Sequence, residues 1–267
     1  MADECILVCQ CAGRTVVPED VKTGVLSGLV AKSVSFLPVT DLCGLCAARD
    51  PALKDLAARS SSLTVVACHE RAVRGLLRAA GVQLSGDRLR VLDMRTQTSA
   101  AILEQLSSAA TPEETRVPVE RSLPMDAAAN DWPPWFPVID TERCKQCRQC
   151  LSFCLFGVYA LSPEGQVTVS NPRNCKNNCP ACSRICPEVA IMFPKLAAEE
   201  APLNGAEIRD ETELKARAQI NVQEILGDNV YAALAERRRL AHARRLRRPA
   251  AVAQAEQERA THLTEKP

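Results

Sequence analysis

Two closely spaced cysteine runs constrain this chain more than any other feature of its sequence. In each run three cysteines follow one another at short steps, and a fourth lies slightly further along. The runs are Cys144, Cys147, Cys150 and Cys154, followed by Cys175, Cys179, Cys182 and Cys186. Three closely spaced cysteines suit three corners of a cubane iron–sulfur cluster, and the displaced cysteine can reach a neighbouring cluster. The spacing therefore predicts two [4Fe–4S] clusters and electron-transfer chemistry.

Zinc is the competing interpretation, because paired cysteines also build tetrahedral zinc sites. A structural zinc site usually combines two cysteine pairs that are separated by a longer stretch of chain. Here the first four cysteines fall within eleven residues, and the pattern recurs and closes with Cys186-Pro187. The spacing favours iron–sulfur clusters over zinc and over unligated structural thiols.

Residues 138–195 resemble a bacterial-type two-cluster ferredoxin domain. In such a domain an apolar turn and strand follow each cysteine run, and the matching apolar stretches here are residues 156–161 and 188–193. The resemblance implies an α+β fold with crossed ligation. One cluster would be held by Cys144, Cys147, Cys150 and Cys186, and the other by Cys175, Cys179, Cys182 and Cys154. Two departures are expected to alter cluster exposure without removing a ligand. Leu155 replaces the usual proline, and residues 176–178 lengthen the second run by one residue.

The first 109 residues alternate short apolar runs with amphipathic stretches. Strands are expected at residues 5–9, 34–39, 63–68 and 89–92, and helices at 18–31, 51–59, 71–80 and 99–106. Alternating strands and helices predict an α/β domain over residues 1–109, with a parallel sheet covered on both faces. A proline-rich linker is expected over residues 110–137, and its tryptophans are expected to pack it onto a domain.

The remaining residues, 196–267, are expected to form a helical, arginine-rich tail with helices at 211–226 and 228–248. Residues 236–248 contain seven arginines. We interpret this run as a solvated helix face or a surface that docks a protein, rather than a nucleic-acid reader, because no other feature indicates base recognition.

Cysteines also recur at one end of the expected front strands. Cys9 and Cys11 end the first strand, Cys43 and Cys46 follow the second, and Cys68 ends the third, whereas Cys5 lies within the first strand as an expected core thiol. The carboxyl ends of parallel strands meet along one edge, where such folds place their ligands. We therefore expect these cysteines to converge in space.

The front domain resembles the amino-terminal domain of heterodisulfide reductase A-subunits over about 105 residues. The matching positions are Val8-Cys9-Gln10-Cys11-Ala12-Gly13, Leu42-Cys43, Val65-Val66-Ala67-Cys68 and Leu92-Asp93-Met94-Arg95. The resemblance implies a third iron–sulfur cluster on Cys9, Cys11, Cys43 and Cys68, with Cys46 as a fifth candidate. A zinc site, buried thiols or a redox dithiol at Cys43 and Cys46 remain alternatives. His69 is interpreted as a surface residue that opens the next helix.

Composition and charge narrow the remaining functions. The net charge is +1, and no apolar stretch reaches the ~18 residues of a membrane helix, so we expect no membrane insertion. The acidic start lacks the layout of a secretory signal. Fourteen cysteines without an export signal indicate a reducing compartment, which predicts a cytoplasmic protein.

The sequence contains no glycine-rich dinucleotide fingerprint, no phosphate loop and no nucleophile–histidine–acid set, so we expect no catalytic residue. Clusters pass single electrons, whereas most substrate bonds need an electron pair, so the flavin or catalytic centre would sit on a partner. We interpret the chain as the electron-carrying subunit of a cytoplasmic oxidoreductase complex, with a flavoprotein or other oxidoreductase subunit as redox partner. The alternative is an iron–sulfur redox-sensing regulator that binds a partner or nucleic acid through its arginine-rich helix.

Overall fold

The structure, a computed structural model, describes residues 3–12, 14, 16–107, 132–212, 236, 239 and 240. Residues 3–107, here called the front domain, contain one four-stranded sheet. Its strands are β1 (Asp3–Cys9), β2 (Leu37–Val39), β3 (Ser60–Ala67) and β4 (Leu89–Asp93). The spatial order is β2-β1-β3-β4, and every neighbouring pair is parallel. The predicted parallel sheet is therefore confirmed.

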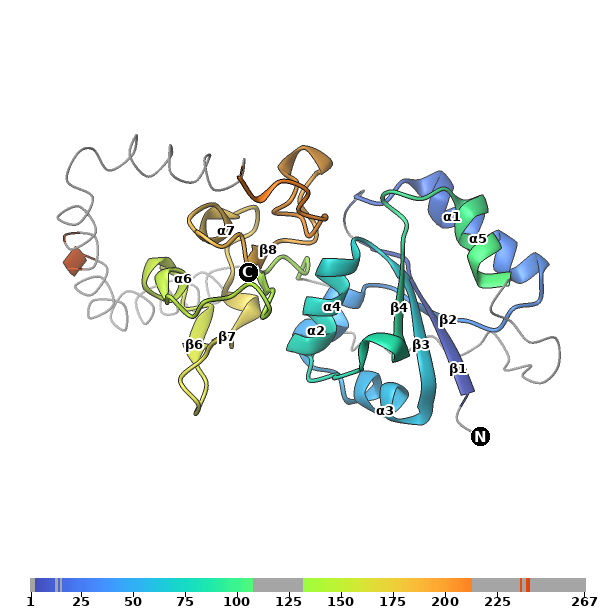
Figure 1. The fold of residues 1–267 in the computed structure, drawn as a ribbon, viewed down its shortest axis with the longest axis horizontal. Coiled ribbons are helices and arrows are strands. Elements are labelled where there is room, and N and C mark those ends of the chain that lie inside the picture. The colour runs from blue at the N-terminus through green and yellow to red at the C-terminus, as the bar shows by residue number, and fades with distance from the viewer. Residues whose placement is uncertain are drawn as a thin grey trace, which may run out of the picture.

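Helices cover both faces of this sheet (Figure 1). Helices α1 (Glu19–Ala31) and α5 (Ser99–Ser107) lie together on one face, and α2 (Leu42–Ala48), α3 (Pro51–Arg59) and α4 (Glu70–Ala79) cover the other. The short 3-10 helix η1 (Gly86–Arg88) leads into β4. Because the central strand β3 has no solvent-facing side, its Val65 and Val66 are completely buried. These aliphatic strands account for a core that contains few aromatic residues.

Helix α2 is an element that the sequence pattern did not predict. Its N-cap is Asp41, whose side chain accepts a hydrogen bond from the Gly44 N–H at 3.1 Å. Leu42 and Leu45 bury one face of the helix, and the left-handed Arg49 ends it at φ 52°. An aspartate at the N-cap position was the available signal. Its consequence is that Cys43 and Cys46 lie one turn apart on a helix.

Residues 138–195, here called the cysteine-run segment, contain two small antiparallel sheets. Strand β5 (Val138–Ile139) pairs with β8 (Ile191–Met192), and β6 (Tyr159–Leu161) pairs with β7 (Val167–Val169). Short helices lie between them: α6 (Gln149–Phe153), the 3-10 helix η3 (Pro172–Asn174) and α7 (Ala181–Arg184). The 3-10 helix η4 (Ala198–Glu200) follows the segment. Strands β6 and β8 lie in the two apolar stretches in which short strands were expected after the cysteine runs.

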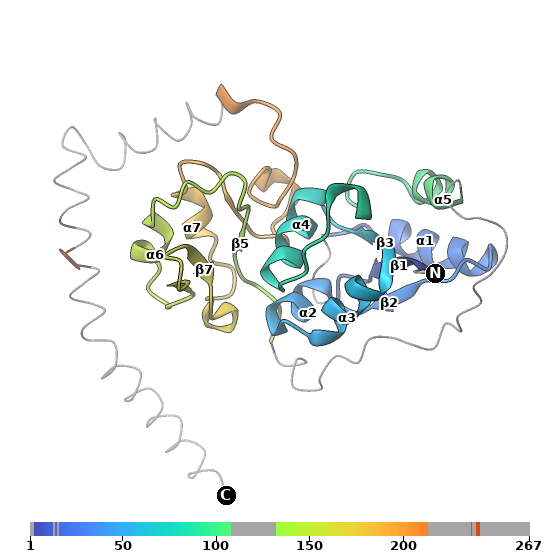
Figure 2. The same cartoon turned by 60° about the horizontal axis from the view of Figure 1, so that its bottom comes forward.

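The cysteine-run segment packs against α4 of the front domain, and both views show the two side by side (Figures 1 and 2). Residues 132–137 lie between two buried clusters: Phe136 belongs to the front-domain core, while Trp135 packs with Phe193 at 5.2 Å between ring centroids. The part of the expected linker that the structure describes is therefore packed against the two clusters, as we expected from its tryptophans. The chain past Leu196 also returns to α4, where Gly205 lies against Ala72.

The expected helices of the tail fall almost entirely outside the described residues. Glu211 and Thr212, and further along Glu236, Arg239 and Leu240, are described and are helical. Residues 108–131 of the expected linker region also lie outside the described part. Among the residues that the structure describes, no helix is long and apolar enough to cross a membrane.

Gly75 provides a test of the packing between α4 and β5. An added Cβ would lie 2.7 Å from Val138 Cγ1 and 3.1 Å from Met192 Cε, whereas at Gly86 nothing lies within 4 Å. We expect Gly75→Ala to lower the free energy of unfolding by about 1–3 kcal/mol through overpacking. Gly86→Ala should stay within about 0.5 kcal/mol of the parent. Anaerobic urea unfolding measures both, and equal effects would contradict the packing described here.

Candidate metal centres

The first candidate centre is a cavity in the cysteine-run segment. Four thiols line it: Cys144, Cys147, Cys150 and Cys186. Cys154, although it belongs to the first run in sequence, is not among the residues that line this cavity. The chain thus brings the last cysteine of the second run to the first three cysteines of the first run. This is the crossed grouping that the ferredoxin resemblance implied.

Local backbone geometry turns the first run around this cavity. The Cys144 N–H donates to the Asp140 carbonyl at 3.0 Å. Gln146 and Arg148 adopt left-handed conformations, with φ of 56° and 62°, and each lies directly before or after Cys147. The Gln146 side chain also accepts a hydrogen bond from the Val167 N–H at 2.7 Å, which ties the turn to β7. Tight left-handed turns allow three cysteines so close in sequence to face a common space.

The remaining four thiols form a second group, Cys154, Cys175, Cys179 and Cys182. Burial raises the pKa of Cys175 to about 12, and neighbouring Cys182, Cys179 and Cys154 add to the rise. Burial likewise raises the pKa of Cys182 to about 12, with Cys154 and Cys179 among the neighbours that add to it. Cys154 therefore lies with the second run. The two groups are close to each other, because Cys182 also raises the pKa of Cys150.

The surroundings of these thiols fit iron–sulfur clusters. The buried Tyr159 hydroxyl lacks a nitrogen or oxygen partner, and burial together with the nearby Cys182, Cys150 and Cys154 thiols raises its pKa. Such a donor suits a cluster sulfur, as does the Ala190 N–H, which already points to Cys186 Sγ at 3.4 Å. Within the described ranges no three His, Cys, Asp or Glu side chains are grouped to hold one metal ion.

A third group of cysteines lies at the carboxyl edge of the front sheet, as expected from the strand ends. Its members, here called the sheet-edge cysteines, are Cys9, Cys11, Cys43 and Cys68, and all four are buried. Burial raises the pKa of every one. Neighbouring thiols add to the rise at three of them: Cys11 at Cys9, Cys68 and Cys11 at Cys43, and Cys11 and Cys9 at Cys68. Cys9 Sγ also accepts backbone N–H groups of Cys11 at 3.4 Å and Leu42 at 3.3 Å. The parallel sheet thus gathers thiols from three strand ends.

The other front-domain candidates take different positions. Cys46 is buried on α2, one turn after Cys43. Burial raises its pKa, and of the sheet-edge cysteines Cys9 adds to that rise. Cys5 lies within β1, where it is partly buried. The interpretation of His69 as a surface residue is wrong: it precedes α4 but is 7% exposed, and its Nδ1 lies 2.7 Å from Asp93 Oδ2. Asp93 ends β4, so the sheet edge itself buries the imidazole.

Lys195 reaches the sheet-edge cysteines from the other side of the interface. Its ammonium donates to the Ala12 carbonyl at 3.1 Å and forms an ion pair with Asp41, with both side chains only 3% exposed. Burial alone would lower the pKa of Lys195, but neighbouring Cys43 and Asp41 raise it overall. A cation next to several thiols favours their ionised, metal-binding form. Sequence reasoning missed Lys195, because nothing near it in sequence marks it as a partner of the front domain.

Arg95 holds this lysine in place. Its guanidinium donates to the Pro194 carbonyl at 3.1 Å and to the Leu196 carbonyl at 3.0 Å, on either side of Lys195. Burial lowers the pKa of Arg95, while the Cys68 thiol, Asp93 and Cys11 oppose that change. The arginine therefore lies near the sheet-edge cysteines and binds the neighbouring segment at the same time.

The second run approaches the same edge. Arg14 donates to the Asn178 side chain and to Asn177 Oδ1 at 3.5 Å, and its guanidinium lies 4.5 Å from the centroid of Trp135. Cys175 packs against the front-domain core. The extra residue in the second run therefore lies in a loop that contacts the front domain.

Comparisons with known proteins cover the cysteine-run segment. Residues 136–217 match the family model described as a 4Fe-4S dicluster domain. The chain is also 51% identical over 61 residues to an uncharacterized ferredoxin of Methanocaldococcus jannaschii, a match that covers 22% of this chain and 41% of that relative. The chain thus spans less than half the length of this curated relative. These matches identify the cysteine-run segment as an iron–sulfur, ferredoxin-like segment. Neither match confirms the resemblance of the front domain to heterodisulfide reductase A-subunits.

The Lys195–Asp41 pair gives a test of the interface. Removing one partner of a buried pair leaves an uncompensated charge, so we expect Lys195→Met to lower the free energy of unfolding by about 3–5 kcal/mol. Adding Asp41→Asn to this variant should recover part of the loss. Arg184→Ala, which breaks an ion pair that is 57% and 34% exposed, should cost at most about 1 kcal/mol. Anaerobic urea unfolding compares the variants, and a Lys195→Met loss no larger than that of Arg184→Ala would refute the role of the pair.

Proposed function

We propose that this chain is an iron–sulfur electron-transfer protein whose cysteine-run segment holds two [4Fe–4S] clusters. One is held by Cys144, Cys147, Cys150 and Cys186, and the other by Cys154, Cys175, Cys179 and Cys182. The observation that carries the proposal is the position of Cys186. It lines the same cavity as the first three cysteines, although 35 residues separate it from Cys150. Cys154, which follows Cys150 closely in sequence, does not line that cavity. This exchange of fourth ligands is the pattern of two-cluster ferredoxins.

The protein's part is to supply ionised thiols and to surround them. Burial raises the pKa of Cys150, Cys175 and Cys182 to about 12, so without metal these thiols stay protonated at neutral pH. Iron binding displaces those protons, which ties cluster assembly to the folding of this segment. When bound, each cluster accepts and releases one electron. The Ala190 N–H and the Tyr159 hydroxyl are then placed to stabilise sulfur-centred negative charge.

We further propose that the sheet-edge cysteines hold a third iron–sulfur cluster. The support is that four buried thiols lie together beside two cations, Lys195 and Arg95, which partly offset the rise in the pKa of Cys11. Two backbone N–H groups already point to Cys9 Sγ. A redox dithiol at Cys43 and Cys46 is less well supported, because burial raises the pKa of both thiols and a reactive thiol needs the opposite.

In this proposal the chain is the electron-carrying subunit of a cytoplasmic oxidoreductase complex, and the flavin or other two-electron centre belongs to a partner subunit. The missing dinucleotide fingerprint supports this division of labour. So does the exposure at the first cavity, where Cys147 is exposed between the exposed Lys145 and Arg148. An exposed ligand lets an electron pass over a short distance to a docked partner. The front domain, through the sheet-edge cysteines, then receives or supplies the electron internally.

Iron, acid-labile sulfide and flavin analysis of the anaerobically purified chain tests the proposal directly, and Cys186→Ser tests the crossed ligation. We expect about eight irons per chain from the ferredoxin-like segment, or about twelve with the third cluster, at four per cluster. Cys186→Ser should lose up to about four irons and alter one low-temperature electron paramagnetic resonance signal. Cys5→Ser, a thiol outside every proposed ligand set, should change neither. An active single chain that carries flavin would refute the subunit role.

The third cluster has its own test in Cys68→Ser. If the sheet-edge cysteines bind a cluster, this variant should contain about four fewer irons than the parent chain. The resonance signals that Cys186→Ser alters should stay unchanged. The matched control is Cys46→Ser, since Cys46 is also buried but lies one helical turn beyond the proposed set. If the parent chain and Cys68→Ser contain equal amounts of iron, the sheet-edge cysteines are a group of buried thiols that hold no cluster.

A further inference from the structure

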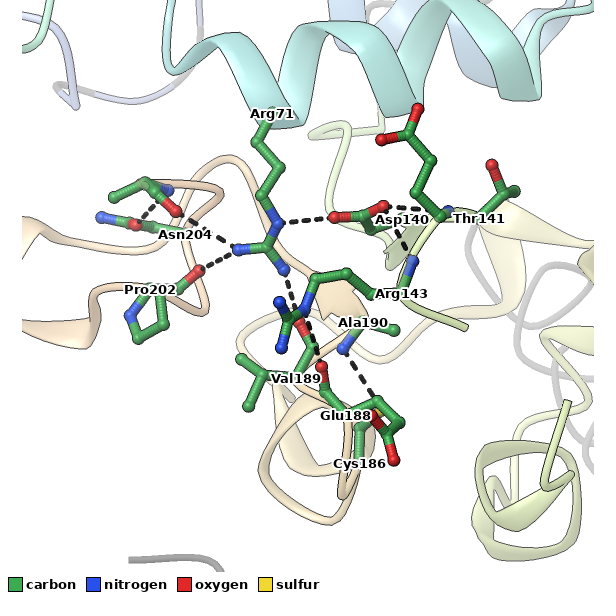
Figure 3. A network of polar contacts seen from close by, with 12 residues as sticks. Arg71, Asp140, Thr141, Arg143, Cys186, Glu188, Val189, Ala190, Pro202 and Asn204 are labelled. Atoms are coloured by element: carbon green, nitrogen blue, oxygen red, sulfur yellow. Dashed lines mark hydrogen bonds and ion pairs between the residues drawn. The ribbon is translucent and has the colours of Figure 1, made fainter. Parts of the chain in front are cut away.

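Arg71 of the front domain projects from α4 into the cysteine-run segment (Figure 3). Its Nε donates to Asp140 Oδ2 at 2.7 Å, and one terminal nitrogen donates to the Pro202 and Ala206 carbonyls at 3.2 Å each. The other terminal nitrogen donates to the Val189 carbonyl. The Arg71 side chain is 15% exposed and that of Asp140 is 12% exposed. One guanidinium therefore joins three stretches of chain that are distant in sequence.

Two of these stretches carry proposed ligands of the same centre. On one side, the Asp140 carbonyl accepts the Cys144 N–H at 3.0 Å, and Asp140 Oδ1 accepts the backbone N–H groups of Glu142 and Arg143 at 3.2 and 3.4 Å. Asp140 thus shapes the turn that leads into the first cysteine run. Arg71 holds the carboxylate that forms this turn.

On the other side, Val189 belongs to the loop that follows Cys186. The Val189 N–H donates to the Cys186 carbonyl at 3.1 Å, and the next N–H, that of Ala190, donates to Cys186 Sγ at 3.4 Å. Val189 adopts a left-handed conformation with φ 49°, a strained geometry for a β-branched residue. Arg71 holds its carbonyl, and Arg143 Nε holds the Glu188 carbonyl at 2.9 Å. Both contacts keep the N–H groups of this loop directed at the sulfur.

The charge of Arg71 also acts on this centre. Burial lowers the pKa of Arg71, whereas Asp140 and, more weakly, the Cys186 thiolate oppose that change. Adding an electron to a cluster increases its negative charge, which a fixed cation and oriented N–H donors stabilise. Arg is suited to this position because its planar fork can satisfy several carbonyls while remaining charged.

We propose that Arg71 is a positioning residue through which the front domain raises the reduction potential of the centre at Cys144, Cys147, Cys150 and Cys186. The proposal rests on the function proposed above, since it requires that these thiols hold a cluster. It makes the front domain part of the electronic environment of the ferredoxin-like segment. The segment would then have a different potential when the front domain is displaced.

The test uses Arg71→Met in the full chain, with anaerobic reductive titration by dithionite followed by electron paramagnetic resonance. A unit charge about 10 Å away, at an effective dielectric constant of about 20, changes an equilibrium constant by about one order of magnitude. We therefore expect the equilibrium constant for one-electron reduction to fall about tenfold, a shift of about −59 mV. The shift should affect only the centre whose signal Cys186→Ser alters.

Two further variants make the test specific. Arg74→Met removes a cation from the same helix, but Arg74 contacts Glu70 and the Leu89 carbonyl within the front domain, so it should leave every potential unchanged. Arg71→Lys keeps the charge but not the fork, so it should shift the same centre in the same direction by a smaller factor. If Arg71→Met fails to retain iron, Arg71→Lys decides, and a parental potential in that variant overturns the proposal.

The outcomes separate this proposal from the ligand assignment. If Cys186→Ser leaves iron content and every signal unchanged, the proposed function fails for this centre. If Cys186→Ser removes a centre but Arg71→Met leaves its potential at the parental value, the role of Arg71 fails and the ligand assignment stands. An equal shift in Arg71→Met and Arg74→Met would also overturn the proposal, because it would reflect the general loss of a surface charge.

Discussion

The buried ion pair between Lys195 and Asp41 is the interaction on which the arrangement of this protein depends. Both side chains are only 3% exposed, and they come from opposite sides of the interface between the front domain and the ferredoxin-like segment. Replacing either partner would leave the other charge buried without its counter-ion, at a cost of several kcal/mol. The pair therefore joins the two units into one packed body, although the sequence pattern predicts them as separate domains.

Arginines of the front domain reinforce this joint, and each binds the ferredoxin-like segment beside a cysteine group. Arg95 holds the chain around Lys195, Arg14 contacts the loop within the second run, and Arg71 connects the surroundings of Cys144 and Cys186. Exposure and hydrogen bonds to sulfur are the main protein contributions to cluster potential. The front domain supplies cations next to the cysteine groups and excludes water on one side of them. In this way it contributes to the reduction potentials that we propose for the centres. Cys147 is exposed at the first cavity, which leaves an approach to that centre open.

Much of the secondary structure could be predicted because its signals are local. Alternating apolar runs and amphipathic stretches located every front-domain strand, and helix α3 matched its predicted bounds. Helix α2 was missed because its seven residues are too few to display a periodicity, and only its aspartate cap marked it. The burial of His69 was misjudged for a different reason. Its partner Asp93 lies on a strand 24 residues away, and only the parallel sheet places the two side by side.

The sequence by itself determined the type of chemistry, because cysteine spacing of two or three residues is a local property that survives any tertiary arrangement. It also determined that strand ends would carry thiols to one edge of a parallel sheet, since all strands of such a sheet point the same way. Residue spacing alone does not decide that Cys186 joins the first run, which the ferredoxin resemblance implied and the cavity shows. Only the tertiary structure decided which cations lie against the thiols. Lys195 and Arg71 have no local signature, because the potential at a site sums over charges that are close in space and distant along the chain. The interface between the two units, which no short stretch of sequence encodes, therefore sets the surroundings in which the cysteines act.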